Sequence, residues 1–368
     1  MRIVFYSPYL PKHFGGGEKY LFDTALVYAQ KHRVDIALPA DCDQKDVDKI
    51  KKAYQKHLGV DLKALNFVIS PFGAAKKKWQ RLLWTMRYDV VYFVTDGSAF
   101  YSLARRNIMH IQVPLLLGRK SGWERVKFKR FKVINANSNF TKKTVEKYWD
   151  IKVNMVCQPG VEVGEFQLPP AATKEKIILN VGRFFDSLHT KNQDSLVEFW
   201  RELCQKHPEE TKDWKLVLVG KVESEEYAAR VAQLAAGASV EIYHEVSHEQ
   251  LVEWYRRAAI YWHATGWRDQ EWEHPERMEH FGISTVEAMA AGAVPIVVAK
   301  GGQKEILGQK LRECAWENKA ECLRLTLQVM KNEKLRQQWS ELASKRAANY
   351  DMKQFAKRCW QMLESKRI

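Results

Sequence analysis

Short apolar runs alternate along the chain with longer segments in which apolar residues recur every three or four positions. Apolar or β-branched runs bounded by polar turns predict buried strands, and the longer segments predict helices that bury one face. In the first half we expect strands at 2–6, 34–38, 66–69, 90–94, 107–112 and 133–137. Helical patterns lie between several of them, for example at 18–32 and 141–148.

The same alternation starts again in the second half. We expect strands at 177–181, 216–219, 240–243, 260–262 and 294–298, and helices at 195–205, 224–236, 247–258 and 284–291. The last 50 or so residues, from Lys319, show only helical spacing. Continuous apolar strands alternating with helices are typical of parallel sheets that are covered on both faces.

The predicted fold class is therefore α/β, with two doubly wound, Rossmann-like domains facing a cleft. We place the first domain at 1–165 and the second at 166–350, and expect a C-terminal helix at about 351–368 to pack back on the first. A length of 368 residues supports two domains, and 46% hydrophobic residues suffice for two cores. In such sheets ligands bind at the carboxyl ends of the strands, so motifs directly after strands deserve the closest inspection.

Several features argue for a cytoplasmic protein. No apolar run is long enough for a membrane-spanning helix, and the apolar run at 3–6 is too short for a secretory signal. The six cysteines are scattered without a C-x-x-C pair, which argues against a disulfide framework and a zinc ribbon.

The positive charge lies in the first half. Residues 1–160 hold 29 Lys and Arg against 13 Asp and Glu, a net of +16, whereas residues 161–368 hold 30 against 31. A basic half can face nucleic acid, an anionic membrane or a phosphorylated substrate. Because no zinc-finger, RRM or helix-turn-helix signature accompanies the charge, we do not expect a nucleic-acid partner.

Three motifs carry candidate chemistry. The first is Gly15-Gly16-Gly17, which follows the first strand and opens a helix. Glycines let the backbone approach a ligand closely, and a helix N-terminus offers N–H donors to an anion. The motif is not G-x-G-x-x-G, so the dinucleotide fingerprint is absent. Taken alone, it is equally typical of a tight turn.

The second motif is Gly182-Arg183, directly after the strand at 177–181, with Lys191 eight positions after Arg183. Two cations at the carboxyl end of a strand can neutralise a diphosphate without a metal ion. A surface Arg and Lys on a loop is the plainer alternative.

The third motif runs from Glu279 to Glu287, with seven residues between the two glutamates. We interpret Ser284 as the cap of the helix that contains Glu287. The N–H groups near Ile283 and Ser284 would then face a phosphate, with one carboxylate on sugar hydroxyls and the other on a ribose. Two solvated glutamates beside a packed helix start remain the alternative.

Together these motifs resemble the GT-B glycosyltransferases, specifically the retaining family 4 enzymes with the E-x7-E motif. Supporting segments occur in the family's order: His110 to Pro114, Asn137 to Thr141, Gln158 to Val161, and Gly301-Gly302. The stretch from Trp262 to Gly292 is the most specific. It also resembles the mannosyltransferases that extend lipid-linked oligosaccharides in eukaryotes.

The resemblance implies a role for each motif. Arg183 and Lys191 would bind the donor diphosphate together with the segment from Phe281 through Gly282 and Ile283 to Ser284. Glu287 would hold the ribose, and Glu279 the hydroxyls of the transferred sugar as a catalytic residue. The loop Gly15, Gly16 and Gly17 would close over the phosphates. The family usually has a His two residues before Pro114; here that position is Gln112, and His110 stands two residues earlier. Either side chain can be the second catalytic contact to the donor sugar, and our prediction is His110.

No metal and no other cofactor is expected. Asp41-Cys42-Asp43 resembles a D-x-D metal motif but lies in a polar loop without a further ligand. The histidines at 263, 274 and 280 have spacings that match no common zinc site.

The predicted activity is transfer of a sugar, with retained configuration, from a GDP-sugar or UDP-sugar to an acceptor hydroxyl. The acceptor would be a lipid-linked or surface-glycan precursor at the inner face of the membrane. A sugar-nucleotide epimerase of the same fold and a transferase for a soluble acceptor are the alternatives. We expect the basic half to dock on an anionic membrane through two segments. One is Lys76 to Trp84, where Trp79, Leu82, Leu83 and the following Met86 fall at helical spacing; packing of the same apolar stripe on the sheet is the alternative. The other, Arg119 to Lys132, is the better candidate because it mixes three aromatics with seven cations.

Overall fold

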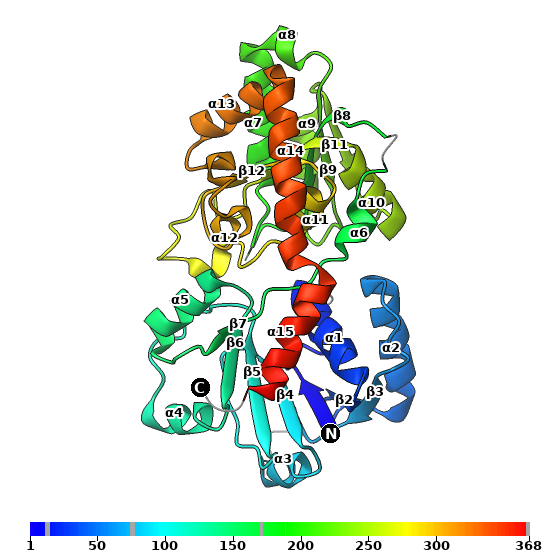
Figure 1. Ribbon diagram of the computed structural model, residues 1–368, viewed down its shortest axis with the longest axis vertical. Helices are drawn as coiled ribbons and strands as arrows, with labels where there is room; N and C mark the ends of the chain where they lie inside the picture. Colours follow the sequence, from blue (N-terminus) through cyan, green and yellow to red (C-terminus); the bar gives the residue numbers. More distant parts are fainter. Residues whose placement is uncertain (12–14, 74–77, 170–171, 188, 366–368) are drawn as a thin grey trace. The chain divides into compact units, whose positions relative to one another are not determined.

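The structure divides into two units, each built on one parallel sheet (Figure 1). The computed structural model describes residues 1–11, 15–73, 78–169, 172–187 and 189–365. The first unit comprises Met1–Gly160 with Lys353–Ile368, and the second comprises Val161–Met352. Of the C-terminal helix expected at 351–368, residues 366–368 lie outside the described ranges.

The sheet of the first unit has the order β3-β2-β1-β4-β5-β6-β7, and all its neighbouring strands are parallel. Its strands are β1 (Arg2–Tyr6), β2 (Arg33–Leu38), β3 (Asn66–Ile69), β4 (Val90–Thr95), β5 (Arg106–Ile111), β6 (Val133–Ala136) and β7 (Met155–Val156). Its helices are α1 (Gly16–Ala29), α2 (Gln44–Leu58), α3 (Lys78–Thr85), α4 (Gly122–Phe128), α5 (Asn139–Trp149) and α15 (Met352–Glu364).

Helices cover both faces of this sheet because alternate strand residues point to opposite sides. Tyr92 in β4 packs with Tyr28 of α1, whereas its neighbour Phe93 faces the cluster that includes Phe128 and Trp149 of α4 and α5. The helix α15 belongs to the α1 side, since the hydroxyl of Tyr28 donates to the Cys359 carbonyl at 2.9 Å. The C-terminal helix thus returns to the first unit.

The sheet of the second unit has the order β10-β9-β8-β11-β12-β13 and is also parallel throughout. Its strands are β8 (Glu175–Val181), β9 (Lys215–Val219), β10 (Val240–Tyr243), β11 (Ala258–His263), β12 (Val294–Val298) and β13 (Ala315–Trp316). Its helices are α6 (Val163–Phe166), α7 (Gln193–Lys206), α8 (Pro208–Thr211), α9 (Glu225–Ala235), α10 (His248–Arg257), α11 (Ile283–Ala290), α12 (Gln303–Leu307), α13 (Lys319–Lys331) and α14 (Glu333–Ala347). Three 3-10 turns complete the described elements: η1 (Pro275–Arg277), η2 (Arg312–Cys314) and η3 (Ala348–Tyr350).

The strands predicted from the apolar runs are all present, with ends that differ by at most two residues. The strands β7 and β13, absent from the prediction, have two residues each and therefore leave no periodic pattern. The predicted class of two doubly wound α/β domains is confirmed. Within the described ranges, no helix combines the length and the apolar character needed to cross a bilayer.

Each sheet has one point at which the strand order reverses, between β1 and β4 and between β8 and β11. At such a point the connections leave to opposite faces and the loops diverge, which opens space for a ligand at the carboxyl ends. The glycine motif at 15–17 follows β1, and the Arg183–Lys191 loop follows β8.

Candidate active site

The loop after β8 begins at the reversal point of the second sheet. A Cβ on Gly182 would stand 2.4 Å from Lys191 Cγ, so only a glycine leaves room for the lysine to cross the end of the strand. The start of α7 holds this loop, because Gln193 Nε2 donates to the carbonyl oxygens of Gly182 and Arg183 at 3.1 and 3.2 Å.

Lys191 and Glu279 form the charged centre of the site. Lys191 Nζ lies 2.5 Å from Glu279 Oε2, and both side chains are only 17% exposed. His263, the last residue of β11, is buried, and its Nε2 lies 3.1 Å from the same oxygen. Burial alone would raise the pKa of Glu279, but the Lys191 ammonium and the His263 N–H more than offset it, so this pKa lies well below its usual value. Glu279 is therefore a carboxylate at neutral pH, able to accept hydrogen bonds and unable to act as an acid.

A glycine turn after β12 holds the backbone of Glu279. The N–H of Gly302 donates to the Glu279 carbonyl at 2.7 Å. A Cβ on Gly301, whose φ is +60°, would stand 2.3 Å from that carbonyl oxygen, and one on Gly302 would stand 2.5 Å from the carbonyl oxygen of His280. The predicted Gly301-Gly302 segment thus supports Glu279 by close backbone packing.

The helix α11 begins directly after Glu279, and its first residue is Ile283. A helix leaves the N–H groups of its first turn without partners inside the helix, so Ile283 and Ser284 offer donors to an anion. The prediction that Ser284 caps this helix is wrong. Gly282 occupies the cap with φ +110°, and the hydroxyl of Tyr261 donates to Ser284 Oγ at 2.8 Å. Glycine is required there because a Cβ would stand 2.5 Å from Gln303 Nε2.

Glu287 and Phe281 are both anchored to the protein interior. The hydroxyl of the buried Tyr255 donates to Glu287 Oε2 at 2.8 Å, one turn along α11 from the cap. Phe281 is buried against Tyr350, with ring centroids 5.3 Å apart. Only the backbone of Phe281 can therefore contribute to the donor site for which this residue was predicted.

Arg183 occupies the exposed side of the same loop. Its Nη1 lies 2.8 Å from Glu223 Oε2, and its guanidinium carbon lies 5.6 Å from the centre of the Phe185 ring. The structure therefore brings Lys191, Glu279 and the start of α11 together, and it pairs the second predicted cation with a different carboxylate.

The glycine motif of the first unit adjoins Gln112. The helix α1 begins at Gly16, and the carboxylate of Glu18 accepts from the Gly15 N–H at 2.9 Å. A Cβ on Gly17 would stand 3.3 Å from Gln112 Cγ, so the helix start and the end of β5 approach closely.

His110 lies behind Gln112. Its ring is buried and stacks on Tyr20 with centroids 3.8 Å apart. Nδ1 lies 2.6 Å from Asn135 Oδ1, and Nε2 lies 2.9 Å from Gln112 Oε1. Asn135 Nδ2 donates to the Met109 carbonyl, which fixes its Oδ1 as the acceptor for Nδ1–H.

The His110 ring is uncharged at neutral pH. Burial lowers the pKa of His110 to about 4, and its two amide partners offset this only in part. Of the two side chains weighed for the contact with the donor sugar, the half-buried Gln112 lies beside the glycine motif, and the buried His110 lies behind it within hydrogen-bond distance. The catalytic role of His110 stays a prediction.

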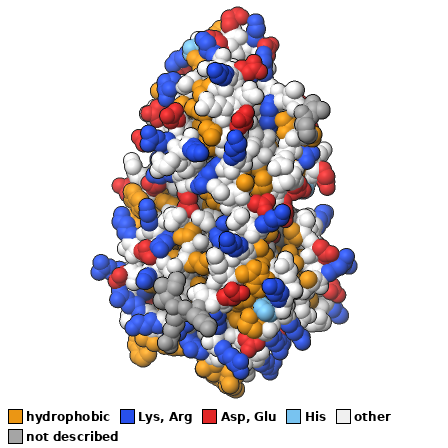
Figure 2. All heavy atoms as spheres, in the orientation of Figure 1, with side chains coloured by type: hydrophobic (Ala, Val, Ile, Leu, Met, Phe, Trp, Pro, Cys, Tyr) orange, Lys and Arg blue, Asp and Glu red, His pale blue; other side chains and the backbone are white. Residues whose placement is uncertain are grey.

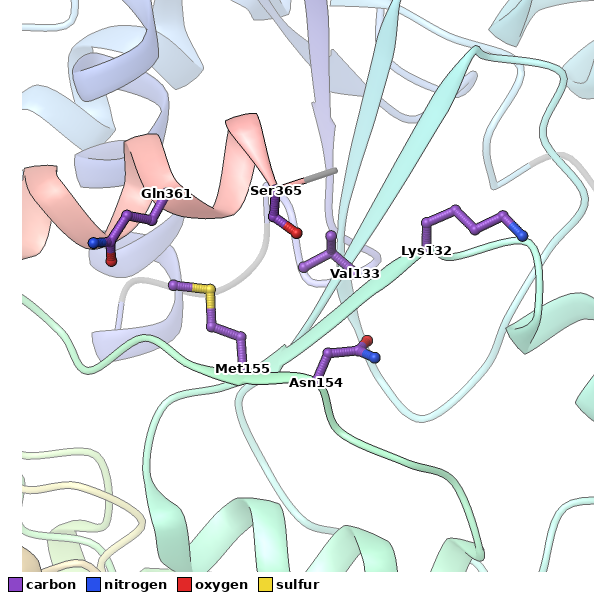
Figure 3. A pocket seen from close by; sticks show the side chains of 6 residues that line it. All are labelled: Lys132, Val133, Asn154, Met155, Gln361 and Ser365. Atoms are coloured by element: carbon purple, nitrogen blue, oxygen red, sulfur yellow. The ribbon is translucent and has the colours of Figure 1, made fainter. Parts of the chain in front are cut away.

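A hollow of about 260 Å³ in the first unit lies away from these motifs. Lys132, Val133, Asn154 and Met155 line it at the amino ends of β6 and β7, together with Gln361 and Ser365 at the end of α15 (Figure 3). Ligands of doubly wound sheets bind at the opposite, carboxyl edge, so this hollow is not a candidate for the active site.

The described residues include no group of three or more His, Cys, Asp or Glu side chains arranged to hold a metal ion. Asp43, from the D-x-D resemblance, instead caps α2 by accepting from the Asp46 N–H at 2.9 Å.

Sequence reasoning missed His263 and Gln303 as neighbours of Glu279. His263 stands at the carboxyl end of the buried strand β11. The same criterion, a polar residue at the carboxyl end of a strand, identified Arg183 and could have identified His263. Gln303 starts α12, and its Nε2 lies 3.3 Å from His263 Nε2. Nothing in the local sequence marks a buried glutamine of this kind.

Residues 165–346, just under half of the chain, match the family described as Glycosyl transferases group 1. The matched residues all lie within the second unit. The match includes Arg183, Lys191, Glu279 and Glu287, so the residues at the β8–β11 reversal point all lie inside it.

Two curated relatives match in sequence. The chain is 30% identical over 200 residues to the GDP-Man:Man(3)GlcNAc(2)-PP-Dol alpha-1,2-mannosyltransferase of Neurospora crassa, covering 47% of this chain and 34% of the relative. It is 28% identical over 197 residues to the lipopolysaccharide core biosynthesis mannosyltransferase LpsB of Rhizobium meliloti, covering 50% of each. The matches therefore span a third to a half of the length of these relatives.

The fold has solved counterparts over its whole length. The crystal structure of Anabaena HepE in complex with UDP and glucose aligns with a TM-score of 0.68 at 16% identity and covers all of both chains. This similarity confirms the predicted GT-B type of fold.

Proposed function

We propose that this protein is a metal-independent, retaining glycosyltransferase of the E-x7-E family 4 type. It moves a sugar from a nucleotide-diphosphate donor to an acceptor hydroxyl. The observation that carries the proposal is the Lys191–Glu279 ion pair at the reversal point of the second sheet. Lys191 crosses the strand end at Gly182, and α11 begins four residues after Glu279. Such a centre combines a cation and helix N–H groups for a diphosphate with a carboxylate for sugar hydroxyls.

Each residue has a stated part in this chemistry. Arg183, Lys191 and the N–H groups of Ile283 and Ser284 stabilise the leaving diphosphate electrostatically, and Glu287 holds the ribose. Both cations already have carboxylate partners, so a diphosphate must share or displace them. A carboxylate whose pKa is held well below its usual value is a weak base, so Glu279 is not the group that takes the acceptor's proton. That proton goes to the departing phosphate.

GDP-mannose is the first donor to test, and UDP-sugars follow. Two relatives bear the name mannosyltransferase, one of them with GDP-Man in its name, whereas the Anabaena structure holds UDP and glucose. We propose a lipid-linked or surface-glycan precursor as the acceptor, and a cytoplasmic enzyme that is peripheral on the inner face of the membrane.

A transfer assay tests the function. The purified chain is incubated with GDP-mannose or UDP-glucose, with and without lipid-linked oligosaccharide acceptors, and the anomeric configuration of the product is determined by NMR. Transfer with retained configuration supports the proposal. Conversion of the donor to an epimer without acceptor would instead establish the epimerase alternative, and an inverted product would exclude the proposed mechanism.

A further inference from the structure

Exposed large apolar side chains gather on the first unit. The described residues include twelve of them, and Trp272 is the one that lies in the second unit. Soluble proteins carry scattered apolar surface residues, but a concentration on one unit indicates a contact surface.

The helix α3 presents an apolar face outward. Trp79, Leu83 and Met86 follow at helical spacing and are 63%, 50% and 60% exposed. The other face is inside, where Trp84 lies 5.7 Å from the Phe72 ring and Thr85 is fully buried. A helix on the outside of a soluble domain normally has polar residues on the face that it turns to solvent.

Two further segments join this face to make one surface. Leu103 N–H donates to Thr85 Oγ1 at 2.9 Å, which ties the exposed Tyr101 and Leu103 to the end of α3. Arg130 donates to the carbonyl oxygens of Ser102 and Ala104 at 2.7 and 2.9 Å, which ties the end of α4 to the same loop.

The helix α4 exposes Trp123 by 78% and also exposes Val126. We call α3 with Met86, the loop 101–103 and α4 the docking surface. Figure 2 shows hydrophobic side chains at this end of the first unit with Lys and Arg around them.

The charge around the docking surface is positive. Residues 119–132 contain seven Lys and Arg against one Glu. Lys120, Phe128 and Phe131 are buried, which leaves Trp123 as the one outward aromatic of that segment. Arg119, Arg125, Lys129 and Lys132 of the same segment are exposed. Lys76 and Lys77, which the sequence analysis placed beside α3, lie outside the described residues.

We infer that the docking surface inserts Trp79, Leu83 and Trp123 into the interface of an anionic lipid bilayer. Exposed tryptophans and leucines beside several cations suit the boundary between head groups and acyl chains, where both interactions act at once. The inference deepens the proposed function, on which its biological purpose rests, because it gives the surface through which the enzyme would reach a lipid-linked acceptor.

Vesicle co-sedimentation tests the inference. Wild type is mixed at low salt with vesicles of phosphatidylcholine alone, or of phosphatidylcholine and phosphatidylglycerol in equal parts. We expect binding to the anionic vesicles only, and weaker binding at high salt. The variant W79Q/L83Q/W123Q should lose roughly tenfold in affinity for each tryptophan removed. The exposed Trp272→Gln in the second unit is the matched control and should bind like wild type.

Three results would overturn the inference: no binding to anionic vesicles at low salt, equal binding by the triple variant, or a triple variant that changes oligomeric state in light scattering and keeps vesicle binding. Heparin binding without vesicle binding would also count against it and assign the basic unit to a soluble polyanion.

Donor hydrolysis without vesicles separates this inference from the proposed function, because the triple variant should turn over donor like wild type. Lys129→Gln/Lys132→Gln, with Lys334→Gln as the control, tests the charge separately if the triple variant is poorly folded.

Discussion

The two units share a doubly wound plan and differ in their surfaces. The first unit holds 34 Lys and Arg against 14 Asp and Glu, a net of +20, whereas the second holds 25 against 30, a net of −5. Of the twelve exposed large apolar side chains among the described residues, eleven lie in the first unit, and Trp272 alone lies in the second. The same scaffold thus carries a basic surface with exposed apolar side chains in one unit and a slightly acidic surface in the other.

The reversal points differ as well. In the second unit a largely buried ammonium and carboxylate meet at the strand ends, Lys191 on Glu279. In the first unit the corresponding edge holds the neutral Gln112 beside Gly17, with the neutral His110 behind it. From this difference we expect an ionic ligand at the strand ends of the second unit and uncharged hydrogen bonding at those of the first.

Removing the central cation should have the largest effect. Lys191→Ala removes an interaction with the leaving diphosphate, and such losses typically lower turnover by about 10²–10³-fold. The exposed Lys176, which pairs with Asp213 at 2.8 Å in the same unit, is the matched control. Steady-state assays with saturating donor decide the matter. Near wild-type turnover for Lys191→Ala would break the proposed division between the units.

The buried His110 should make the first unit sensitive to acid. Because the folded pKa of about 4 lies below the unfolded value near 6.5, the stability contributed by the neutral ring is full above pH 6.5 and is lost as the pH falls toward 4. The loss amounts to about 3 kcal/mol. Urea unfolding at pH 7 and pH 4.5 should show a smaller pH dependence for His110→Gln than for wild type. The exposed His244→Gln is the control, and equal pH dependence in all three proteins would refute the buried neutral ring.

Gly182→Ala should act on Lys191 alone. The new Cβ would stand 2.4 Å from Lys191 Cγ, so the flexible lysine has to leave the strand end while the backbone stays. We expect roughly a tenfold loss in kcat/KM for the donor, because the cation is displaced and not removed. Gly164→Ala in α6, where a Cβ meets nothing within 4 Å, is the control. Full activity with unchanged donor KM would show that the crossing of Lys191 over Gly182 is unimportant.

Chelation should have the smallest effect. If cations and helix N–H groups stabilise the diphosphate, transfer in excess EDTA should stay within about a factor of two of the untreated rate. The comparison is made on the same preparation with and without added Mg²⁺ or Mn²⁺. A strict requirement for either ion would remove the metal-independent mechanism and leave the site assignment standing.

The sequence predicted the sheets well because short, β-branched apolar runs such as 90–94 and 294–298, bounded by polar turns, are typical of buried strands. It also placed Lys191 and Glu279 in one site through the motif resemblance. The sequence-based prediction was wrong where a contact between distant residues decides the local structure, as at the start of α11. Ser284 looks like a cap, but close packing of Gln303 demands Gly282 there.

The sequence also did not show which side chains of a helical segment are buried and which are exposed. The aromatics of 119–132 look alike in sequence, yet Phe128 and Phe131 enter the core while Trp123 faces outward. Likewise, His110 lies against the amide of Asn135 on a neighbouring strand, which no local pattern reveals.

Hydrogen exchange with two added ligands tests the division of labour most directly. With GDP, the account predicts slower amide exchange at 182–193 and 279–287 in the second unit. With vesicles of phosphatidylcholine and phosphatidylglycerol, it predicts slower exchange at 79–86, 101–103 and 122–126 in the first. Protection of the second unit's segments by vesicles, or of the docking surface by GDP, would contradict it, as would GDP leaving 182–193 and 279–287 unchanged.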